Sequence, residues 1–279
     1  MRILLAGDTH GAIGHSQYLI RTALVKECDR IFVLGDFGYW EHQKAGVKFL
    51  DQLSEYAAGL GVRVYFLDGN HDKVSLLLEK YDGLFDEQGF IIVRPNVLYA
   101  PRNHRWTWDE VRFVALGGAY SVDKEWRLSQ ECVWEEDVQV CTLNHKHKNP
   151  PESLWFPEEE MSDEDMDLFL NDTAKVDVML AHDKPRSSNP KWNRKDYLEC
   201  LPNQDRLQRA MRVLQPKSFF HGHLHYFYTD EVWCGSSTSD MISTKVMGLL
   251  CNPEAGEPGL YVNKTLSWQV LDTTEAWWQ

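Results

Sequence analysis

Histidine, aspartate and asparagine gather at five points of the sequence, each beside glycine or another small residue. The stretches read GDTH, GD, GNHD, AHD and HGHLH, and their polar members include Asp8, His10, Asp36, Asn70, His71, Asp72, His182, His223 and His225. These side chains offer oxygen and imidazole nitrogen atoms but no thiolate, a mixture that suits Zn, Mn or Fe rather than an iron–sulfur cluster. A catalytic zinc takes about three protein ligands, so the set is too large for one ion and fits two.

Two ions about 3.5 to 4 Å apart clamp the oxygens of an in-line displacement and lower the pKa of a shared water toward about 7, which is the chemistry of phosphoester hydrolysis. Such a pair needs a bridging carboxylate, and Asp36 is the candidate because it stands alone on its turn. A single Asp or Asn after a strand is usually only a turn former. The joint pattern, rather than any one residue, therefore indicates a metal site.

Each polar stretch follows a short, mainly apolar run. These runs are RILLA from Arg2, RIFVL from Arg30, RVYFL from Arg63, VDVML from Val176 and KSFF from Lys217. Short continuous apolar runs predict strands buried on both faces. Residues 15–28, 44–59 and 73–81 have helical spacing and alternate with the first three strands, which predicts a parallel sheet with right-handed crossovers. Because ligands gather at the carboxyl ends of such strands, the five stretches should converge.

The remaining segments predict a second sheet. Residues 90–118 contain shorter apolar runs broken by Pro and Asn, which are typical of a second sheet or an antiparallel edge. Residues 226–233, 245–251 and 260–271 alternate like antiparallel strands. Two sheets face to face with helices outside is the expected architecture. The acidic run at residues 157–167 is interpreted as a solvated surface in which Ser162 starts a helix.

Composition narrows the class of protein. A chain of 279 residues can form one domain with a large core. The six cysteines are scattered, which indicates free thiols in a reducing compartment. A formal net charge of −13 would repel a phosphate backbone and argues against long nucleic acid as a partner. No run approaches the roughly 18 apolar residues of a membrane helix, so we expect a soluble, cytoplasmic protein without membrane contact.

The ordered set of stretches resembles a known superfamily. GD-x-H, GD, GNHD, a lone His and GH-x-H, each after a predicted strand, look like the five motifs of the calcineurin-like metallophosphoesterases. The match runs from Asp8 to His225, and the order of the motifs makes the set specific although each is short. The resemblance implies an α/β fold, a four-layer αββα sandwich of two mixed β-sheets flanked by helices. It also implies a single domain over residues 1–279, with a polar insertion at about 121–170.

The resemblance assigns the ligands to two divalent ions. It places Asp8, His10 and His225 at the first ion, Asn70, His182 and His223 at the second, and Asp36 between them as the bridge. Manganese is the expected metal, with iron, zinc or nickel as alternatives. His221 matches neither position of GH-x-H, and we expect it to be a buried, hydrogen-bonded neighbour of the ligands.

A mechanism follows from the same resemblance. A metal-bridging hydroxide would attack the phosphorus of a small phosphomonoester or phosphodiester. His71 would protonate the leaving oxygen as a general acid, or donate to the charge that develops on the phosphoryl group, and Asp72 is the candidate to orient it. General acids of this kind contribute about 10² to 10⁴ in rate. Four loop residues, Arg102, Asn103, Lys184 and Arg186, are candidates to meet the phosphate, although a solvated loop charge is the favoured interpretation for each.

Two departures from the family pattern bear on the substrate. Relatives that act on phosphoserine and phosphothreonine follow the second GD with an Asp-Arg pair, whereas this sequence reads GDFGYW, and they carry GNHE where this sequence carries GNHD. Both differences argue against a dedicated Ser/Thr protein phosphatase. They favour the bacterial and phage-type branch, whose small stand-alone members act on phosphomonoesters or phosphodiesters.

Two other functions stay open at this point. The chain could be a catalytically idle, metal-bearing scaffold that binds a partner protein, or a nuclease of the same superfamily. The presence of His71 argues against an idle scaffold, and the acidic balance without a basic tract argues against a nuclease.

Overall fold

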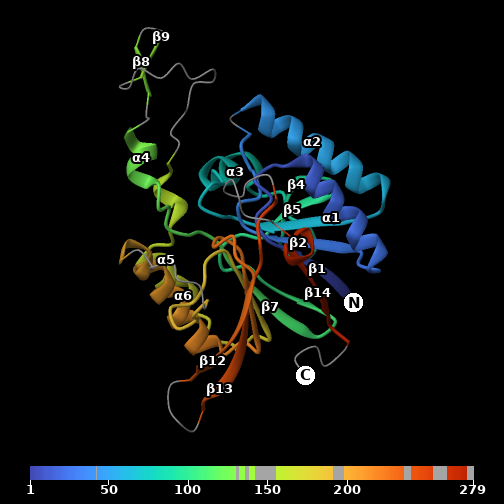
Figure 1. Ribbon diagram of the computed structural model, residues 1–279, viewed down its shortest axis with the longest axis vertical. Helices are drawn as coiled ribbons and strands as arrows, with labels where there is room; N and C mark the ends of the chain where they lie inside the picture. Colours follow the sequence, from blue (N-terminus) through green and yellow to red (C-terminus); the bar gives the residue numbers. More distant parts are fainter. Residues whose placement is uncertain are drawn as a thin grey trace.

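The computed structural model describes residues 1–41, 43–129, 132–135, 138–141, 155–190, 198–235, 240–253 and 263–274 of the chain. Two six-stranded mixed sheets face each other, and helices lie outside both (Figure 1). This arrangement is the expected αββα sandwich. None of the helices in the described ranges is long and apolar enough to cross a membrane.

The first sheet has the strand order β14-β1-β2-β3-β5-β4. Its strands are β1 (Arg2–Ala6), β2 (Arg30–Leu34), β3 (Arg63–Leu67), β4 (Ile91–Arg94), β5 (Val97–Tyr99) and β14 (Trp268–Asp272). The four inner strands run parallel, and β4 and β14 pair antiparallel at the two edges. The helices α1 (Ile13–Val25), α2 (Lys44–Gly59) and α3 (Val74–Tyr81) pack against its outer face, as the helical spacing predicts.

The second sheet has the order β12-β13-β11-β10-β7-β6. Its strands are β6 (Arg105–Trp108), β7 (Val111–Leu116), β10 (Val178–Ala181), β11 (Ser218–His221), β12 (Tyr228–Cys234) and β13 (Ile242–Gly248). The helices α5 (Asp163–Phe169) and α6 (Leu201–Leu214) cover its outer face. The helix α4 (Lys124–Ser129) leads into the hairpin of β8 (Cys132–Glu135) and β9 (Val138–Cys141), which extends away from the sandwich in Figure 1.

The core explains why the strand runs are apolar without a break. In β1, Leu4 and Ala6 pack toward the helices, whereas Ile3 and Leu5 pack between the two sheets. Both faces of the strand are therefore dry, and no position favours a polar residue.

Three expectations need correction. The five strands that carry the polar stretches do not share one sheet, because β1, β2 and β3 lie in the first and β10 and β11 in the second. The strand β13 pairs antiparallel with β12 but parallel with β11. The segment expected at 260–271 forms a strand only from Trp268, after the short 3₁₀ helix Lys264–Leu266, and residues 260–262 lie outside the described part of the chain.

The acidic run also differs from a uniformly solvated surface. Ser162 does start α5, since its hydroxyl accepts a hydrogen bond from the backbone N–H of Asp165 at 3.0 Å. Glu159, however, is 1% exposed and forms an ion pair with Arg127 at 2.7 Å. Glu159 is thus a buried structural residue rather than a solvated one, and Arg127 compensates its charge, because a buried charge needs a partner.

A second buried carboxylate ties α3 and β4 to the loop after β2. Glu41 accepts hydrogen bonds from Tyr39 at 2.8 Å and from Tyr81 at 2.7 Å, and it pairs with Arg94 at 2.6 Å and Lys80 at 3.0 Å. Burial alone would raise the pKa of Glu41, but the hydrogen bonds from Tyr81, Arg94 and Lys80 lower it from 4.5 to about 2.

This depressed pKa predicts a pH-dependent stability. Because the folded pKa lies below the unfolded value, ionised Glu41 stabilises the fold above about pH 4.5, and that contribution is lost as the pH falls toward 2. We expect the free energy of unfolding to fall more steeply between about pH 5 and pH 2.5 in the wild type than in Glu41→Gln. Urea titrations across this range measure the difference. The exposed Glu79→Gln should follow the wild type, and equal slopes for Glu41→Gln and the wild type would contradict the prediction.

Candidate metal centre

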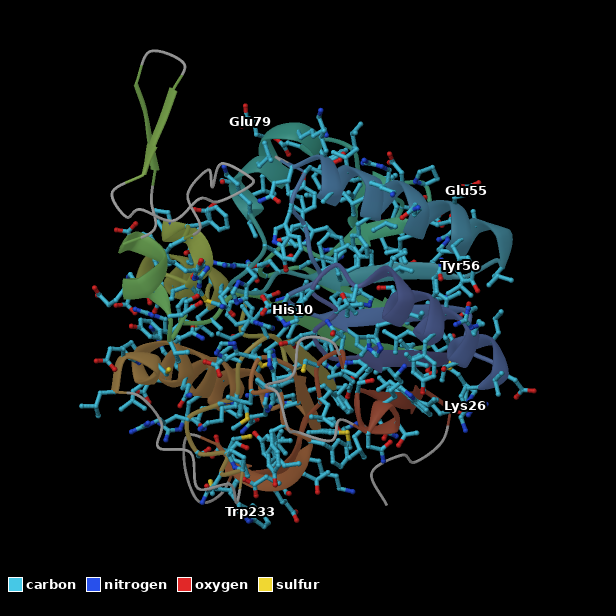
Figure 2. The ribbon with its side chains drawn as sticks, turned by 45° about the horizontal axis from the view of Figure 1, so that its top comes forward. His10, Lys26, Glu55, Tyr56, Glu79 and Trp233 are labelled. Carbon is cyan, nitrogen blue, oxygen red and sulfur yellow. The ribbon has the colours of Figure 1, made fainter. Side chains whose placement is uncertain are left out.

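The polar stretches converge at the carboxyl ends of strands from both sheets. Asp8, Asp36 and Asn70 follow β1, β2 and β3 of the first sheet, and His182 and His223 follow β10 and β11 of the second. Since the sheets are packed face to face, these strand ends meet across the sandwich. Figure 2 shows His10 close to the centre of the molecule, between the two halves.

One cluster contains Asp8, His10, Asp36 and His225, whose ligand atoms all lie within 4.8 Å of one another. His225 Nε2 is 3.0 Å from Asp8 Oδ2 and 3.1 Å from His10 Nε2. Ligands that each lie about 2.1 Å from a shared ion are about 3.0 to 3.4 Å from each other. His225 therefore has the spacing of a shared ligand to both Asp8 and His10, while His10 Nε2 and Asp8 Oδ2 lie farther apart, at 3.9 Å.

A second cluster lies on the other side of Asp36. His182 Nε2 is 3.1 Å from Asn70 Oδ1 and 3.4 Å from Asp36 Oδ1, again the spacing of shared ligands. His182 Nδ1 lies 2.7 Å from the carbonyl oxygen of Leu34. A carbonyl only accepts, so Nδ1 carries a proton, which leaves Nε2 as the ring nitrogen that could bind a metal ion. The ring of the half-buried His223 lies 5.0 Å from that of His182, centroid to centroid.

Asp36 stands between the clusters. Its Oδ1 faces His182 at 3.4 Å, and its Oδ2 faces His10 Nδ1 at 3.9 Å. The backbone N–H of His71 donates to Oδ1 at 2.9 Å and holds the carboxylate in this orientation. Its two oxygens thus point to the two groups of ligands, which is the placement that a bridging ligand requires.

The electrostatics of the site favour cations. Burial alone would raise the pKa values of the two carboxyls and lower those of the imidazoles. Against this, His225 and His182 lower the pKa of Asp8 to about 2, and His182 lowers that of Asp36 well below its usual range. In return, Asp36 raises the pKa of His182 to about 10, and Asp8 raises that of His225 to about 11. The pocket stabilises positive charge, so divalent ions fit its donors and its charge.

The backbone is strained at the same residues. His10, Asp36, His223 and His225 have φ values of 46°, 43°, 64° and 51°, in the left-handed region that residues with a Cβ rarely adopt. Such strain persists where the surrounding structure enforces it, and it concentrates at functional sites. Gly222 shows how tight the site is, since a Cβ there would collide with Asp8 Oδ1.

His71 lies at the edge of the cluster and reaches solvent. Its side chain is 34% exposed, and its Nε2 is 4.0 Å from Asp36 Oδ2. The indole N–H of Trp40 donates to the carbonyl oxygen of His71 at 2.7 Å, so Trp40 supports the loop that carries this residue.

Asp72 has a different role from the expected one. Its carboxylate accepts hydrogen bonds from the backbone N–H groups of Phe37, Gly38, Tyr39 and Gly69, at 2.7 to 3.0 Å. It therefore joins the loop of Asp36 to the loop of Asn70, rather than orienting the His71 ring. Burial and the nearby Asp36 raise its pKa to about 6.

His221 behaves as expected. It is fully buried, with Nε2 2.8 Å from the hydroxyl of Tyr228 and Nδ1 2.8 Å from the carbonyl oxygen of Gly222. Burial lowers its pKa to about 4, which keeps the ring neutral. It supports the turn that carries His223 and His225.

Two of the four loop candidates for phosphate contact are not solvated charges. Lys184 is 1% exposed, and its ammonium donates to the carbonyl oxygen of Ser188 at 3.0 Å. Arg102 pairs with the buried Asp68 at 2.8 Å. Both are held by internal partners, because a charge removed from water needs compensation.

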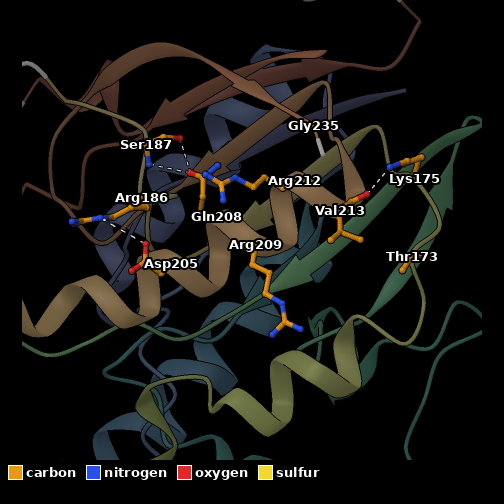
Figure 3. Close-up of a pocket in the computed structure, with 10 residues that line it drawn as sticks. All are labelled: Thr173, Lys175, Arg186, Ser187, Asp205, Gln208, Arg209, Arg212, Val213 and Gly235. Carbon is orange, nitrogen blue, oxygen red and sulfur yellow. Dashed lines mark hydrogen bonds and ion pairs between the residues drawn. The ribbon is translucent and has the colours of Figure 1, made fainter. Parts of the chain in front are cut away.

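Arg186 lies in a separate place. It lines a groove of about 680 Å³ along α6, together with Lys175, Asp205, Arg209 and Arg212, as Figure 3 shows. None of the candidate metal ligands is among the lining residues. The groove and the metal cluster are therefore separate sites.

Comparison with known proteins identifies the family. The family model for calcineurin-like phosphoesterases matches residues 1–227, so the chain belongs to that family. With the cluster of Asp8, His10, Asp36 and His225, membership makes the chain a metal-dependent phosphoesterase that binds divalent metal ions. A comparison with curated proteins yields no match.

Several solved structures are similar to the chain. A protein of Thermus thermophilus is 11% identical with a TM-score of 0.49, over 90% of this chain and 89% of that one. A dimetal phosphatase from Danio rerio is 16% identical with a TM-score of 0.46, over 90% of this chain and 87% of that one. An archaeal phosphodiesterase is 15% identical with a TM-score of 0.29, over 50% of this chain and 82% of that one.

Proposed function

We propose that the chain is a dinuclear hydrolase of small phosphomonoesters or phosphodiesters, with Asp36 between two ions and His71 as the general acid. The observation that carries this proposal is the position of Asp36, whose two oxygens face the two clusters at 3.4 and 3.9 Å. A site for one ion would not need a carboxylate presented to both sides.

The ligand set of the proposal covers seven side chains. Asp8, His10 and His225 would hold one ion, Asn70, His182 and His223 the other, and Asp36 both. Imidazole, carboxylate and amide donors without thiolate suit Mn²⁺, which we propose as the native metal, with Fe, Zn or Ni as alternatives. Bound there, two divalent ions would supply Lewis-acid stabilisation of the phosphoryl oxygens and a water activated at neutral pH.

The protein's own side chains have defined tasks in this reaction. Asp8 and Asp36 are buried and supply the negative charge that holds cations at the ends of the strands. His71 Nε2, which faces the cluster and is accessible, would donate the proton to the leaving oxygen. Because the ring reaches solvent, it can take up a proton again after each turnover.

The loop after Asp36 supports a small substrate over a phosphoprotein. Phe37 and Tyr39 are 1% and 0% exposed and pack into the core, and Gly38 lies against Gly11. This loop thus offers no cation at the place where phosphoserine phosphatases of the family carry their Asp-Arg pair. We therefore propose that phosphopeptides are poor substrates.

A panel of substrates and metals tests the proposal. The metal-free protein is supplied with Mn, Fe, Ni or Zn and assayed on a nitrophenyl monoester, linear and cyclic diesters, a phosphopeptide and short single-stranded DNA. We expect turnover of a monoester or a diester, highest with Mn²⁺, and little turnover of the phosphopeptide. Two bound ions without hydrolysis of any ester would favour a scaffold instead, and cleavage of the DNA alone would favour a nuclease.

A further inference from the structure

A chain of buried polar side chains joins the segment after β7 to the candidate ligand Asn70. Arg127, in α4, donates to Glu159 at 2.7 and 3.1 Å, and the hydroxyl of Ser121 donates to Glu159 Oε2. Asn70 Nδ2 donates to the oxygen of Ser121 at 2.9 Å, and Asn70 Oδ1 lies 3.1 Å from His182 Nε2. All four members of the chain, from Arg127 to Asn70, are at most 4% exposed.

The direction of each hydrogen bond follows from the number of protons available. A carboxylate only accepts, so Glu159 takes the single hydroxyl proton of Ser121. The Ser121 oxygen can then only accept, and the group that it accepts from must be the NH₂ of Asn70. The amide of Asn70 is therefore held with its nitrogen toward Ser121 and its oxygen toward His182.

This orientation decides whether Asn70 can bind a cation. The carbonyl oxygen of an amide is a metal ligand, and its NH₂ group is a donor with no lone pair to offer. A reversed amide would point two N–H groups at the place of the second ion. The hydrogen-bond chain excludes this reversal as long as Glu159 is ionised.

Glu159 is itself fixed from several sides. Its Oε1 accepts from the backbone N–H of Phe156 at 3.2 Å, and its own carbonyl oxygen accepts from the N–H of Ala119 at 2.9 Å. Burial raises its pKa to about 7, although Ser121 and Arg127 oppose the rise. At about pH 8 the group is mainly a carboxylate, which is the condition chosen for the test.

We propose that Ser121 and Glu159 are positioning residues for the second metal site, which act by orienting the amide of Asn70. This inference rests on the two-ion site of the proposed function. It also gives the polar insertion at 121–170 a task, because Ser121 lies at its beginning and Glu159 near its end. Residues that orient metal ligands typically contribute about 10- to 100-fold to metal affinity.

The test measures Mn²⁺ binding rather than turnover. Metal-free protein is dialysed against increasing Mn²⁺ at about pH 8, and the ions bound per chain are counted by metal analysis. For the wild type we expect two ions. For Ser121→Ala we expect the first ion to bind as in the wild type and the second about 10- to 100-fold more weakly. Ser121→Thr, which keeps the hydroxyl, should restore the second ion.

Matched variants distinguish a lost orientation of the Asn70 amide from a general loss of stability. Ser162→Ala removes the helix-capping hydroxyl of α5 in the same insertion and should bind both ions normally. In Glu159→Gln the new amide can donate to Ser121, which permits the reversed Asn70, so the second ion should again bind weakly. The neighbouring Glu160→Gln is its control. Because Glu159→Gln removes one of the two carboxylates that pair with Arg127, the other being Asp123 at 3.0 Å, thermal melts of the metal-free variants accompany the binding curves. The decisive variant is Ser121→Ala.

The outcomes distinguish the two proposals. If the wild type binds fewer than two ions, the proposed function fails and this inference fails with it. If the wild type binds two ions and Ser121→Ala binds both with unchanged affinity, only the inference fails. Equal weakening of both ions in Ser121→Ala would assign Ser121 a purely structural role and would also overturn the inference.

Discussion

Replacing Asp36 with asparagine is expected to lower the affinity for the second metal ion by more than about 100-fold and to abolish most of the turnover. Residues that merely orient a ligand contribute about 10- to 100-fold, so loss of the shared ligand itself should exceed that range. The amide of the Asp36→Asn variant keeps one oxygen for the backbone N–H of His71, but it can no longer present a charged oxygen to both clusters.

Metal analysis and a phosphatase assay on Asp36→Asn measure the two effects together. The exposed Asp51→Asn on α2 is the control, since Asp51 is 58% exposed and pairs only at the surface with Arg94. Circular dichroism of the metal-free variant establishes that the fold is retained. Two ions bound with wild-type affinity by Asp36→Asn would mean that Asp36 is not the bridge.

The second large effect is expected for His71→Asn, which should retain both ions and lose about 10² to 10⁴ in rate. His71 lies at the edge of the cluster with its side chain 34% exposed, and it is not among the four residues whose ligand atoms all lie within 4.8 Å of one another. Its loss should therefore remove a proton donor and spare the metal site.

Comparing two leaving groups makes this test specific. A general acid matters most when the leaving oxygen is basic, so the loss should be larger for an alkyl phosphate than for a nitrophenyl phosphate. Errors in protein concentration or metal content cancel in the ratio of the two rate losses. The opposite result would be a His71→Asn variant that loses a metal ion and regains the wild-type rate when the metal is resupplied. In that case His71 is a ligand, and the assignment to proton transfer is wrong.

Much of the site could be predicted because its signals are local. An apolar strand run followed at once by Asp, Asn or His is visible within about ten residues, and the carboxyl ends of parallel strands collect ligands in any such sheet. The helix α2 was predicted at its observed bounds for the same reason, since its spacing of apolar residues is contained in the helix itself. The burial and hydrogen bonding of His221 were also predicted correctly.

The missed features depend on contacts between distant residues. Asp72 resembles a partner for the adjacent His71 in the sequence, yet its oxygens are used by the N–H groups of Phe37, Gly38 and Tyr39, more than thirty residues away. Glu159 lies in a run that resembles a solvated surface, and only the fold brings it to Arg127 and Ser121. No local pattern marks either contact, because the satisfaction of buried polar groups is decided by the packed interior.

The sequence by itself determined which side chains could bind metal, the strands that carry them and their order along the chain, because these depend on residue type and short-range periodicity. The tertiary structure decided the division of those strands between two sheets, the placement of Asp36 between the two clusters and the left-handed backbone at His10 and His225. It also decided the orientation of the Asn70 amide through Ser121. Each of these depends on groups far apart in the chain that become neighbours only when both faces of the strands are buried.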